Sequence, residues 1–210
     1  MTQSPKVDPP LDSNDTAKRL PASERRRQIV RTASQVLAER GIDHVRMPEV
    51  AERAGVTRAI VYRFFANRQE LLAAILVDFR EEIERRYKER SSLLREGRPI
   101  DVAVRGFIAA TCDAIDTTGA GGFVLLNMDG PDPELAELAR ATRESLHAPW
   151  LARISNVTDV DRVMATAISA MSVASSRAVI ALYLDRTITR DQAADVLARG
   201  VAALLAEFRR

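Results

Sequence analysis

MPEVAERAGVTRAIVYRFF, residues 47–65, is the stretch that decides the fold. Its first part places apolar residues one helical turn apart, on one face of a short helix: Met47, Val50, Ala51 and Ala54. Gly55 follows directly, and glycine accepts the positive φ that ends a helix and redirects the chain. Thr57 can cap a second helix, because its hydroxyl can accept a backbone N–H of the first turn. The stretch therefore predicts two short helices joined by a tight turn.

The second helix of this pair has two unlike sides. Val61 and Phe65 are apolar and four residues apart, so they predict the side that packs against the protein. The outward side carries Arg58, Ala59, Tyr62 and Arg63. Arginine can bond guanine edges or phosphate, tyrosine can donate to phosphate, and a small residue lets the backbone approach a major groove. The pattern favours DNA binding, although a helical hairpin with a solvated charged side is the alternative on these residues alone.

The residues around this stretch closely resemble the N-terminal domain of the tetracycline-repressor (TetR) family. The resemblance covers roughly residues 24–75 and rests on the order, spacing and type of residues in four segments: Gly41-Ile42, AERAGVT at 51–57, VYRFF at 61–65 and NRQELL at 67–72. Beyond residue 75 only the helical pattern and the length match. In such a family the C-terminal part of the chain, here called the body, differs between members, since each member adapts it to its own ligand.

The resemblance implies an all-α fold with two domains. A three-helix helix-turn-helix DNA-binding domain would occupy residues 21–68, and a helical effector-binding and dimerisation domain would occupy residues 69–210. It also implies a homodimer that binds a palindromic double-stranded DNA operator, acts as a repressor, and is released by an unknown small-molecule effector without any cofactor. Residues 1–20 are poor in apolar residues and contain several Pro and Asp, so they predict a disordered tail.

Three residues depart from the pattern that the family usually shows. Arg46 stands where Ser or Thr usually precedes the second helix, Ile60 where a small polar residue is common, and Phe64 where histidine is common. Ile60 could touch a thymine methyl or belong to the core. With these departures included, the expected DNA-contacting residues are Arg46, Thr57, Arg58, Ala59, Ile60, Tyr62, Arg63, Asn67 and Arg68. Asn67 and Arg68 begin the next helix, whose N-terminal N–H groups can face a phosphate.

The charge of the chain is uneven. The net charge of the 210 residues is only +2, yet residues 18–68 contain 12 Lys or Arg against 5 Asp or Glu. A basic N-terminal part on a mildly acidic body suits one end for nucleic acid and another for a different partner. Cys112 is the only cysteine, so no intrachain disulfide can form, and no basic-then-apolar leader begins the chain. We expect a cytoplasmic protein.

A first helix is expected to precede the helix-turn-helix. Ser23 is a candidate cap, Gly41 should end the helix after Arg40, and the inner side should consist of Ile29, Ala33, Val36 and Leu37. Arginines 25–27 lie near its start, where the helix dipole disfavours positive charge. They indicate either a phosphate contact or a solvated side.

The sequence after residue 68 predicts further helices separated by short breaks. A helix capped by Asn67, with Glu70 three residues later, should continue through Ile83 into a charged segment. Residues 119–122, Gly-Ala-Gly-Gly, are expected to be a flexible break. Asp132 and Pro133 suit the cap and first position of a helix that runs to about residue 155. Thr158 is a candidate cap for the helix after it.

The last two helices, at about residues 160–184 and 189–208, are expected to form the homodimer interface, with packing inside one chain as the alternative. The first of them carries little charge and many Ala and Ser, which predicts a buried helix. Its serines, threonine and Arg177 make it too polar for a membrane span, so no membrane contact is expected. Thr189 and Gln192 have capping-box spacing for the second.

No residue cluster indicates catalysis or metal binding. His44 and His147 lack ligand partners at helical spacing, and no nucleophile motif is present, so neither an enzyme nor a metal site is expected. The candidate effector-pocket residues are Phe107, Thr111, Cys112, Phe123, Asn127, Met128, Trp150, Met164, Ile168, Met171 and Arg177, each of which could instead be plain core. Arg177 should pair with Asp116 or meet an anionic effector, because a buried charge needs a partner. An all-helical enzyme and a DNA-binding protein without a ligand are the alternative functions.

Overall fold

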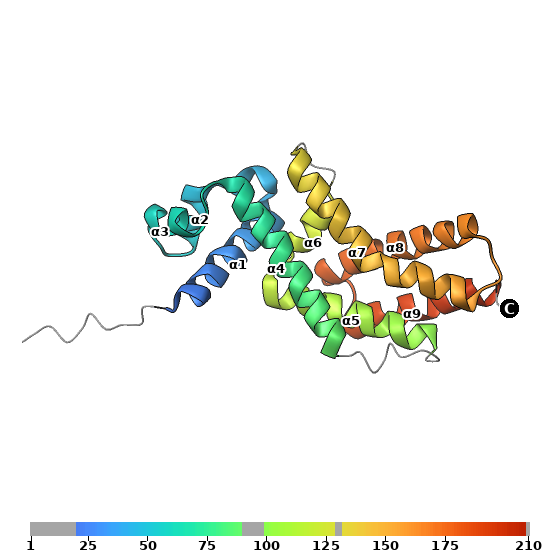
Figure 1. Ribbon diagram of the computed structural model, residues 1–210. Coiled ribbons are helices and arrows are strands. Elements are labelled where there is room, and N and C mark those ends of the chain that lie inside the picture. The colour runs from blue at the N-terminus through green and yellow to red at the C-terminus, as the bar shows by residue number, and fades with distance from the viewer. Residues whose placement is uncertain (1–19, 90–98, 129–131, 209–210) are drawn as a thin grey trace, which may run out of the picture.

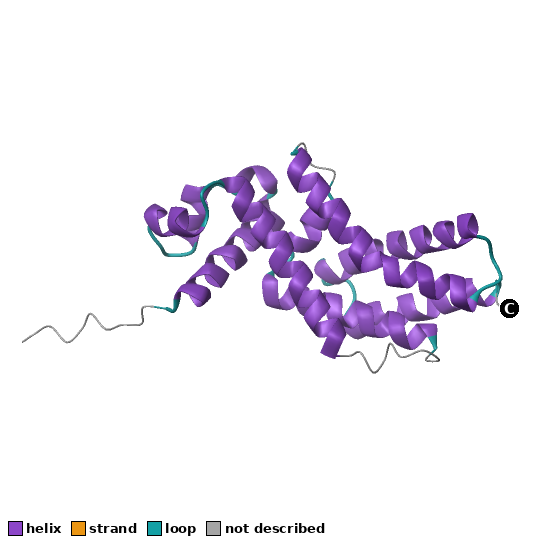
Figure 2. Ribbon diagram, viewed as in Figure 1, coloured by secondary structure: helices purple, strands orange, loops and turns teal. Residues whose placement is uncertain are grey.

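The computed structural model describes residues 20–89, 99–128 and 132–208, which form helices and no strand (Figures 1 and 2). The elements are α1 (Ala22–Arg40), the short 3₁₀ turn η1 (Ile42–His44), α2 (Met47–Arg53), α3 (Arg58–Phe64), α4 (Arg68–Glu89), α5 (Ile100–Thr118), α6 (Gly121–Leu126), α7 (Pro133–Val157), α8 (Arg162–Leu184) and α9 (Arg190–Ala206). The predicted all-α fold is confirmed. The expected disordered tail lies outside the described residues.

The first three helices pack together at one end of the molecule, and their buried residues belong to a hydrophobic core that continues into the body (Figure 1). The expected inner side of α1 is confirmed, because Ile29, Ala33, Val36 and Leu37 are buried, and Gly41 ends the helix with a φ of 86°. Ser23 is not the cap: α1 begins at Ala22, after Pro21, without a side-chain hydrogen bond. Proline lacks a backbone donor and has a fixed φ, so it can begin this helix without a capping side chain.

The long helix α4 runs from this end of the molecule into the body (Figure 1). Its predicted apolar side is buried and consists of Leu71, Leu72, Ile75, Leu76, Phe79 and Ile83. The Asn67 side chain accepts the Glu70 N–H at 2.8 Å, as expected of a cap, but the Glu70 carboxylate accepts from the N–H of Ala66 rather than Asn67, at 2.6 Å. The side chains of Asn67 and Glu70 therefore both stabilise the start of α4.

Helix α6 is where the body meets the N-terminal core. The expected flexible break at residues 119–122 is wrong in its second half, because only Gly119 lies in a left-handed turn, with a φ of 87°, while Gly121 and Gly122 are buried and begin α6. The Gly121 N–H donates to Ser34 Oγ of α1 at 3.0 Å. A Cβ at Gly121 would lie 2.6 Å from the Ser34 carbonyl oxygen, and one at Gly122 would collide with Phe79 of α4. These glycines permit close packing rather than flexibility.

The body consists of α5 and α7 to α9. Asp132 caps α7, where its carboxylate accepts the Leu135 N–H at 3.0 Å, as predicted. The expected cap of α8 is wrong: Asp161 accepts the Met164 N–H at 2.8 Å, whereas the buried Thr158 hydroxyl donates to the Ile154 carbonyl at 2.7 Å. The predicted Thr189–Gln192 capping box of α9 is confirmed.

Helix α8 is largely uncovered in the single chain, which contradicts the expected burial. Of its residues, Ala165, Ile168 and Ile180 are buried, whereas Met164, Met171 and Leu182 are exposed. By length and composition alone the helix could cross a membrane, although a span of this kind by itself is weak evidence. Its neighbour α9 also has a covered side, with Leu197 and Leu205, and an exposed apolar residue, Val196. The two helices thus leave apolar surface open along one side of the body.

Candidate nucleic-acid interface

Helix α3 presents a polar side that nothing in the described part of the chain covers. Val61 is fully buried and Phe65 nearly so, which anchors the helix from behind. Arg58, Ala59, Tyr62 and Arg63 are exposed, as the sequence predicted, and Tyr62 is 52% exposed although it is a large aromatic residue. The Thr57 hydroxyl accepts the Ile60 N–H at 3.3 Å and so caps the helix. A capped helix anchored on one side can enter a groove as a rigid body.

The turn before α3 is held by the protein itself. Gly55 has a φ of 65°, and Val56 N–H donates to the Ala51 carbonyl at 2.9 Å, which closes the turn after α2. From α1, the Gln28 side-chain amide donates to the Ala54 carbonyl at 2.9 Å. This hydrogen bond fixes the end of α2 to α1. The angle between α2 and α3 is therefore set before any DNA is bound.

The arginine cluster at the start of α1 is partly compensated within the chain. Arg26 forms an ion pair with Asp78 of α4 at 3.1 Å, and its guanidinium lies 5.4 Å from the centre of the Phe65 ring. Arg25 donates to Gln28 at 2.7 Å, while Arg27 is exposed. A phosphate is thus not needed to explain Arg26, and only Arg27 of the three remains open to solvent without a recorded partner in the described residues.

Arg68, which was expected to contact phosphate, also holds the N-terminal domain together. Its Nε donates to the Val45 carbonyl at 2.9 Å and its Nη2 to the Ile42 carbonyl at 2.6 Å, so the guanidinium ties the start of α4 to the turn after α1. Arg46 is exposed, with its Nε bonded to the Asp43 carbonyl at 3.0 Å, and Asn67 is exposed at the start of α4. Both lie on the same domain as α3.

The two apolar departures from the family pattern lie between core and surface. Ile60 and Phe64 are half-buried and pack against the hydrophobic core. The Arg63 guanidinium lies 5.1 Å from the centre of the Phe64 ring, which holds Arg63 beside the helix. Phe64 therefore supports the exposed arginine instead of supplying a polar contact of its own.

Comparison with known proteins agrees with this geometry. The sequence model described as "Bacterial regulatory proteins, tetR family" matches residues 29–75. The transcriptional activator FasR of Mycolicibacterium smegmatis is 27% identical over 191 residues, which is 89% of this chain and 85% of FasR. The regulator TtgR of Pseudomonas putida is 38% identical over 60 residues, 29% of each chain.

Solved structures extend the likeness to the body. A TetR-family regulator from Streptomyces coelicolor has a TM-score of 0.66 at 21% identity and covers 90% of this chain and 83% of its own. A TetR-like regulator from Rhodococcus sp. RHA1 has a TM-score of 0.68 at 18% identity and covers 88% of this chain and 97% of its own. The chain belongs to the TetR family. This TetR-family protein is a DNA-binding transcriptional regulator and not an enzyme, since the family match and the relatives and structures named above are all transcriptional regulators.

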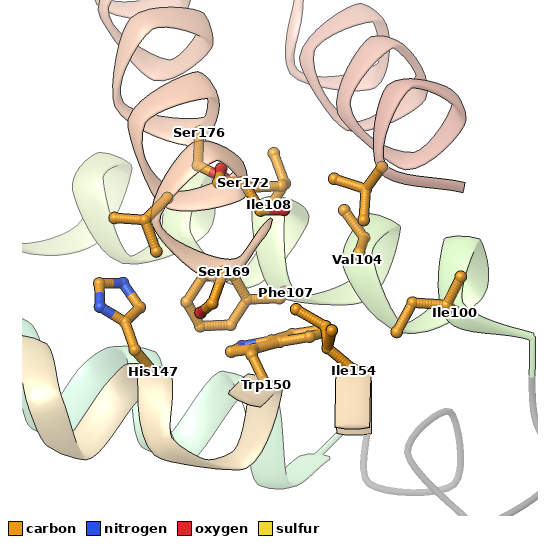
Figure 3. Close-up of a pocket in the computed structure, with 12 residues that line it drawn as sticks. Ile100, Val104, Phe107, Ile108, His147, Trp150, Ile154, Ser169, Ser172 and Ser176 are labelled. Atoms are coloured by element: carbon orange, nitrogen blue, oxygen red, sulfur yellow. The ribbon is translucent and has the colours of Figure 1, made fainter. Parts of the chain in front are cut away.

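The body of the regulator contains a cavity of about 60 Å³ between α5, α7, α8 and α9 (Figure 3). Two of the predicted pocket residues, Phe107 and Trp150, line it, and their ring centres are 5.5 Å apart. Tyr87 of α4 lies 5.5 Å from Phe107 and 6.3 Å from Trp150, again between ring centres. The aromatic cluster therefore joins the cavity to the helix that carries the DNA-binding domain.

A second cavity, of about 40 Å³, lies next to the first. Predicted residues Thr111, Phe123, Asn127 and Arg177 line it together with Phe107. The two cavities share Phe107, His147, Val173 and Ser176 in their walls. The cavities therefore adjoin, and together they form the candidate effector site.

Five predicted pocket residues lie elsewhere. Cys112 and Ile168 are core residues, and Met128 lies at the end of α6; none of these three lines either cavity. Met164 and Met171 are exposed on α8, and Met171 lines an open groove against α9 instead.

The expected pairing of Arg177 with Asp116 is also wrong. Arg177 is exposed, whereas the Asp116 carboxylate accepts a hydrogen bond from the Tyr183 hydroxyl at 2.6 Å. The prediction assumed that α8 is buried, and in the single chain it is not. A charge that stays in water needs no buried partner.

Several cavity residues were not among the candidates. Arg143 and His147 of α7 line the second cavity, and Ser169, Ser172 and Ser176 of α8 line the first, where Figure 3 shows Ser169 beside the Phe107 and Trp150 rings. The serines recur at intervals of three and four residues, a helical spacing that could have identified them from the sequence.

Burial favours the neutral forms of two titratable groups near the cavities, His147 and Cys112. Burial lowers the pKa of His147, and the positive charge of Arg143 lowers it further. Burial raises the pKa of Cys112 to about 12, with the carboxylates of Asp116 and Asp113 adding to the effect. No cluster of His, Cys, Asp or Glu among the described residues could hold a metal ion.

Proposed function

We propose that this regulator is a homodimer that inserts α3 of each subunit into a major groove of a palindromic DNA operator. The observation that carries the proposal is the two-sided geometry of α3. Its inner residues Val61 and Phe65 are buried, while Arg58, Tyr62 and Arg63 are free on the outer side. Arginines on a rigid helix can bond guanine edges bidentately or hold phosphates. In this proposal residues 21–68 contact DNA and residues 69–210 bind the effector and the second subunit.

The second subunit is proposed to pack on α8 and α9, over about residues 160–184 and 189–208. Met164, Met171 and Leu182 of α8 and Val196 of α9 are exposed apolar side chains, and Met171 and Val196 are 56% and 57% exposed. An open groove runs between these two helices. Contiguous exposed apolar surface is typical of a protein interface. The same face of a second subunit would cover the exposed apolar residues of both helices. The packing of the two subunits would then set the spacing of the two DNA-binding domains.

The proposed response to a small molecule runs through the two cavities. A ligand between α5, α7 and α8 would favour whichever separation of the DNA-binding domains fits the filled cavity. The contacts of Tyr87 with the cavity aromatics and of α6 with α1 and α4 offer the physical connection. Release from the operator by the ligand would make the protein a cytoplasmic repressor. Activation is the alternative, and the name of FasR favours it.

Selection of bound duplexes from a random DNA pool tests the proposal. We expect a palindrome whose half-sites lie one helical turn, roughly 34–36 Å, or a small multiple of it apart. Affinity should fall steeply with salt, because phosphate neutralisation releases counterions. Enrichment of a single unrepeated half-site would contradict the dimer, and no enrichment at all would contradict sequence-specific binding.

A DNA-binding regulator that responds to no ligand is the second candidate function. The small size of the cavities, about 60 and 40 Å³, favours it over a large preformed pocket. The two candidates differ in one measurement, the release of the selected duplex across a screen of small molecules. Release by any of them supports the ligand-responsive function.

A further inference from the structure

The two cavities of the body have unlike ends. The first is bounded by aliphatic side chains, Ile100, Val104, Ile154 and Val201, and Figure 3 shows Ile100 and His147 at opposite ends of its lining. The second is also largely apolar, with Ile83, Phe123, Leu126, Leu146 and Ile180 in its wall, but it differs from the first in containing two arginines, Arg143 and Arg177, beside Thr111 and Asn127. Phe107, His147, Val173 and Ser176 form the boundary that both share. Joined end to end, the cavities make one site that is apolar at one end and positive at the other.

The two arginines at the positive end have no acidic partner. No carboxylate among the described residues lines either cavity, and neither Arg143 nor Arg177 forms a recorded ion pair with the described part of the chain. Other arginines of the body are paired: Arg105 with Asp195 at 2.5 Å and Arg190 with Asp113 at 2.8 Å. Arg143 and Arg177 differ from these paired arginines in that both line the second cavity.

Arg143 is held in place although its charge is uncompensated. It is half-buried, and its Nη1 donates to the Leu126 carbonyl at 2.5 Å, which leaves its other N–H groups free. Its field reaches the boundary between the cavities, because it helps to lower the pKa of His147. A negative group placed there would meet a fixed donor with a favourable potential.

Arg177 stands at the mouth of the site and away from the proposed dimer surface. Successive helical residues are rotated by about 100°, so Arg177 points more than roughly 100° away from Met164, Met171 and Leu182 on α8. It is exposed and lines the second cavity. A charged group bound beside it could keep part of its hydration, which lowers the cost of binding a charge at the mouth.

We propose that the effector of this regulator is an organic acid with one anionic head and an unbranched or aromatic apolar body. The inference rests on the effector site of the proposed function and assigns its ligand class. The head lies between Arg143 and Arg177, and the apolar body passes Phe107 and His147 into the aliphatic end. Because the two cavities are small, Phe107 and His147 must turn aside to join them. Their movement would reach Tyr87 of α4 through the aromatic cluster.

Trp150 supplies the readout, because it is the only tryptophan of the chain and lines the first cavity. The probes are octanoate, 1-octanol and octylamine, which share a chain and differ in head group, together with 4-phenylbutyrate, 4-phenyl-1-butanol and 4-phenylbutylamine. Titration of the intact regulator should change Trp150 fluorescence with the acids at a Kd at least about tenfold lower than with the matched alcohols or amines. Equal or tighter binding of the alcohols or amines would overturn the proposal, and so would no response to any acid.

Variants of Arg177 separate the head-group contact from general binding. Arg177→Gln should weaken the binding of the acid about threefold to tenfold and leave the alcohol unchanged, whereas Arg177→Lys should retain most of the affinity for the acid. Arg162→Gln is the matched control, since it removes the same charge from an exposed position at the start of α8, and it should change neither Kd. Equal losses in Arg177→Gln and Arg162→Gln would overturn the assigned head-group site. Arg177 is exposed and forms no hydrogen bond or ion pair with the described residues, so these variants should fold.

The same acids are then added to the complex with the selected DNA duplex. If other molecules release the duplex while no acid binds near Trp150, the ligand class is wrong and the proposed function stands. If an acid binds with the expected Arg177 dependence but leaves the DNA complex unchanged, the site is confirmed and its regulatory role is wrong.

Discussion

The outer sides of α3 and α8 are both uncovered in one chain, but their chemistry is opposite. The side of α3 carries Arg58, Tyr62 and Arg63, and the side of α8 carries Met164, Met171 and Leu182. A basic polar side binds a polyanion favourably, because its cations replace the counterions of the phosphates and release them. An apolar side gains only when another surface excludes water from it. This difference in chemistry supports the proposed DNA contact at α3 and the proposed subunit contact at α8.

The two ends also differ in how complete they are. The inner side of α3 closes on a core made within the chain, where Val61 and Val50 are fully buried. Helix α8 buries few of its own residues and leaves apolar area open. The N-terminal domain should therefore fold on its own contacts, whereas the body should gain stability from a second copy. Four predictions test this difference.

The largest effect is expected from charges placed on the open side of α8. The double variant Met164→Glu, Met171→Glu would bring two carboxylates into an apolar contact. Dimerisation should weaken by at least about 100-fold, or roughly 3 kcal/mol, which sedimentation velocity can measure. Binding to a palindromic duplex should be lost while binding to one half-site remains.

The matched control is Ala141→Glu, Ser145→Glu, which adds the same charge to exposed positions of α7. It should leave the mass in solution unchanged. If the double variant of α8 kept its dimer mass at the same concentrations as the control, the proposal that a second subunit covers this side of α8 would be wrong.

The second prediction concerns the contact that joins the two ends. Gly122→Ala places a Cβ against Phe79 of α4, which should cost about 1–3 kcal/mol of the free energy of unfolding, as overpacking usually does. Urea denaturation measures it. In a Phe79→Leu background the cost should be smaller, because the two positions are in contact and their effects are not additive. Equal costs in both backgrounds would contradict a close contact between α6 and α4.

The N-terminal domain could be predicted well because its signals are local. The apolar spacing on α1 and α2, the turn at Gly55 and the cap at Thr57 each involve residues a few positions apart, and the structure confirms all of them. The hydrogen bonds of Arg68 could not be predicted, because its partners, the carbonyls of Val45 and Ile42, are more than twenty residues away in the chain. A sequence does not show whether an arginine at the start of a helix will donate to backbone carbonyls or to a phosphate.

The body was harder because its residues depend on distant packing. A helix rich in Ala and Ser predicts close approach to another helix, but it does not say whether that helix belongs to the same chain. For this reason the burial of α8, the pairing of Arg177 and the placement of Met164 and Met171 in a pocket were predicted wrongly together. The aromatic residues Phe107 and Trp150 were placed correctly, because large aromatic side chains in the middle of a body line its interior in most arrangements.

The third prediction compares an arginine of α3 with an arginine of the body. Arg58→Ala should cost about 1–3 kcal/mol of binding to the selected duplex and should relax base preference at one position if Arg58 reads a guanine. Arg140→Ala removes the same charge from an exposed position of α7, outside the proposed DNA and subunit contacts, and should leave DNA affinity unchanged. Fluorescence anisotropy at two salt concentrations measures both. A uniform loss across all sequences would reassign Arg58 to a phosphate, and equal affinities of the two variants would remove α3 from the interface.

The smallest effect is expected at Thr57, where capping and DNA contact can be separated. The bond from the Ile60 N–H is long, at 3.3 Å, so Thr57→Ala should lower the free energy of unfolding by about 0.5–1 kcal/mol, at the low end for a helix cap. Thr57→Asp keeps a capping oxygen and adds a negative charge where the helix dipole favours it, so stability should be retained or rise slightly. If Thr57 also lies near a phosphate, that same charge should weaken DNA binding despite the stable fold. Unchanged DNA affinity in a stable Thr57→Asp would show that Thr57 only caps α3, and would move the DNA contacts to Arg58, Tyr62 and Arg63.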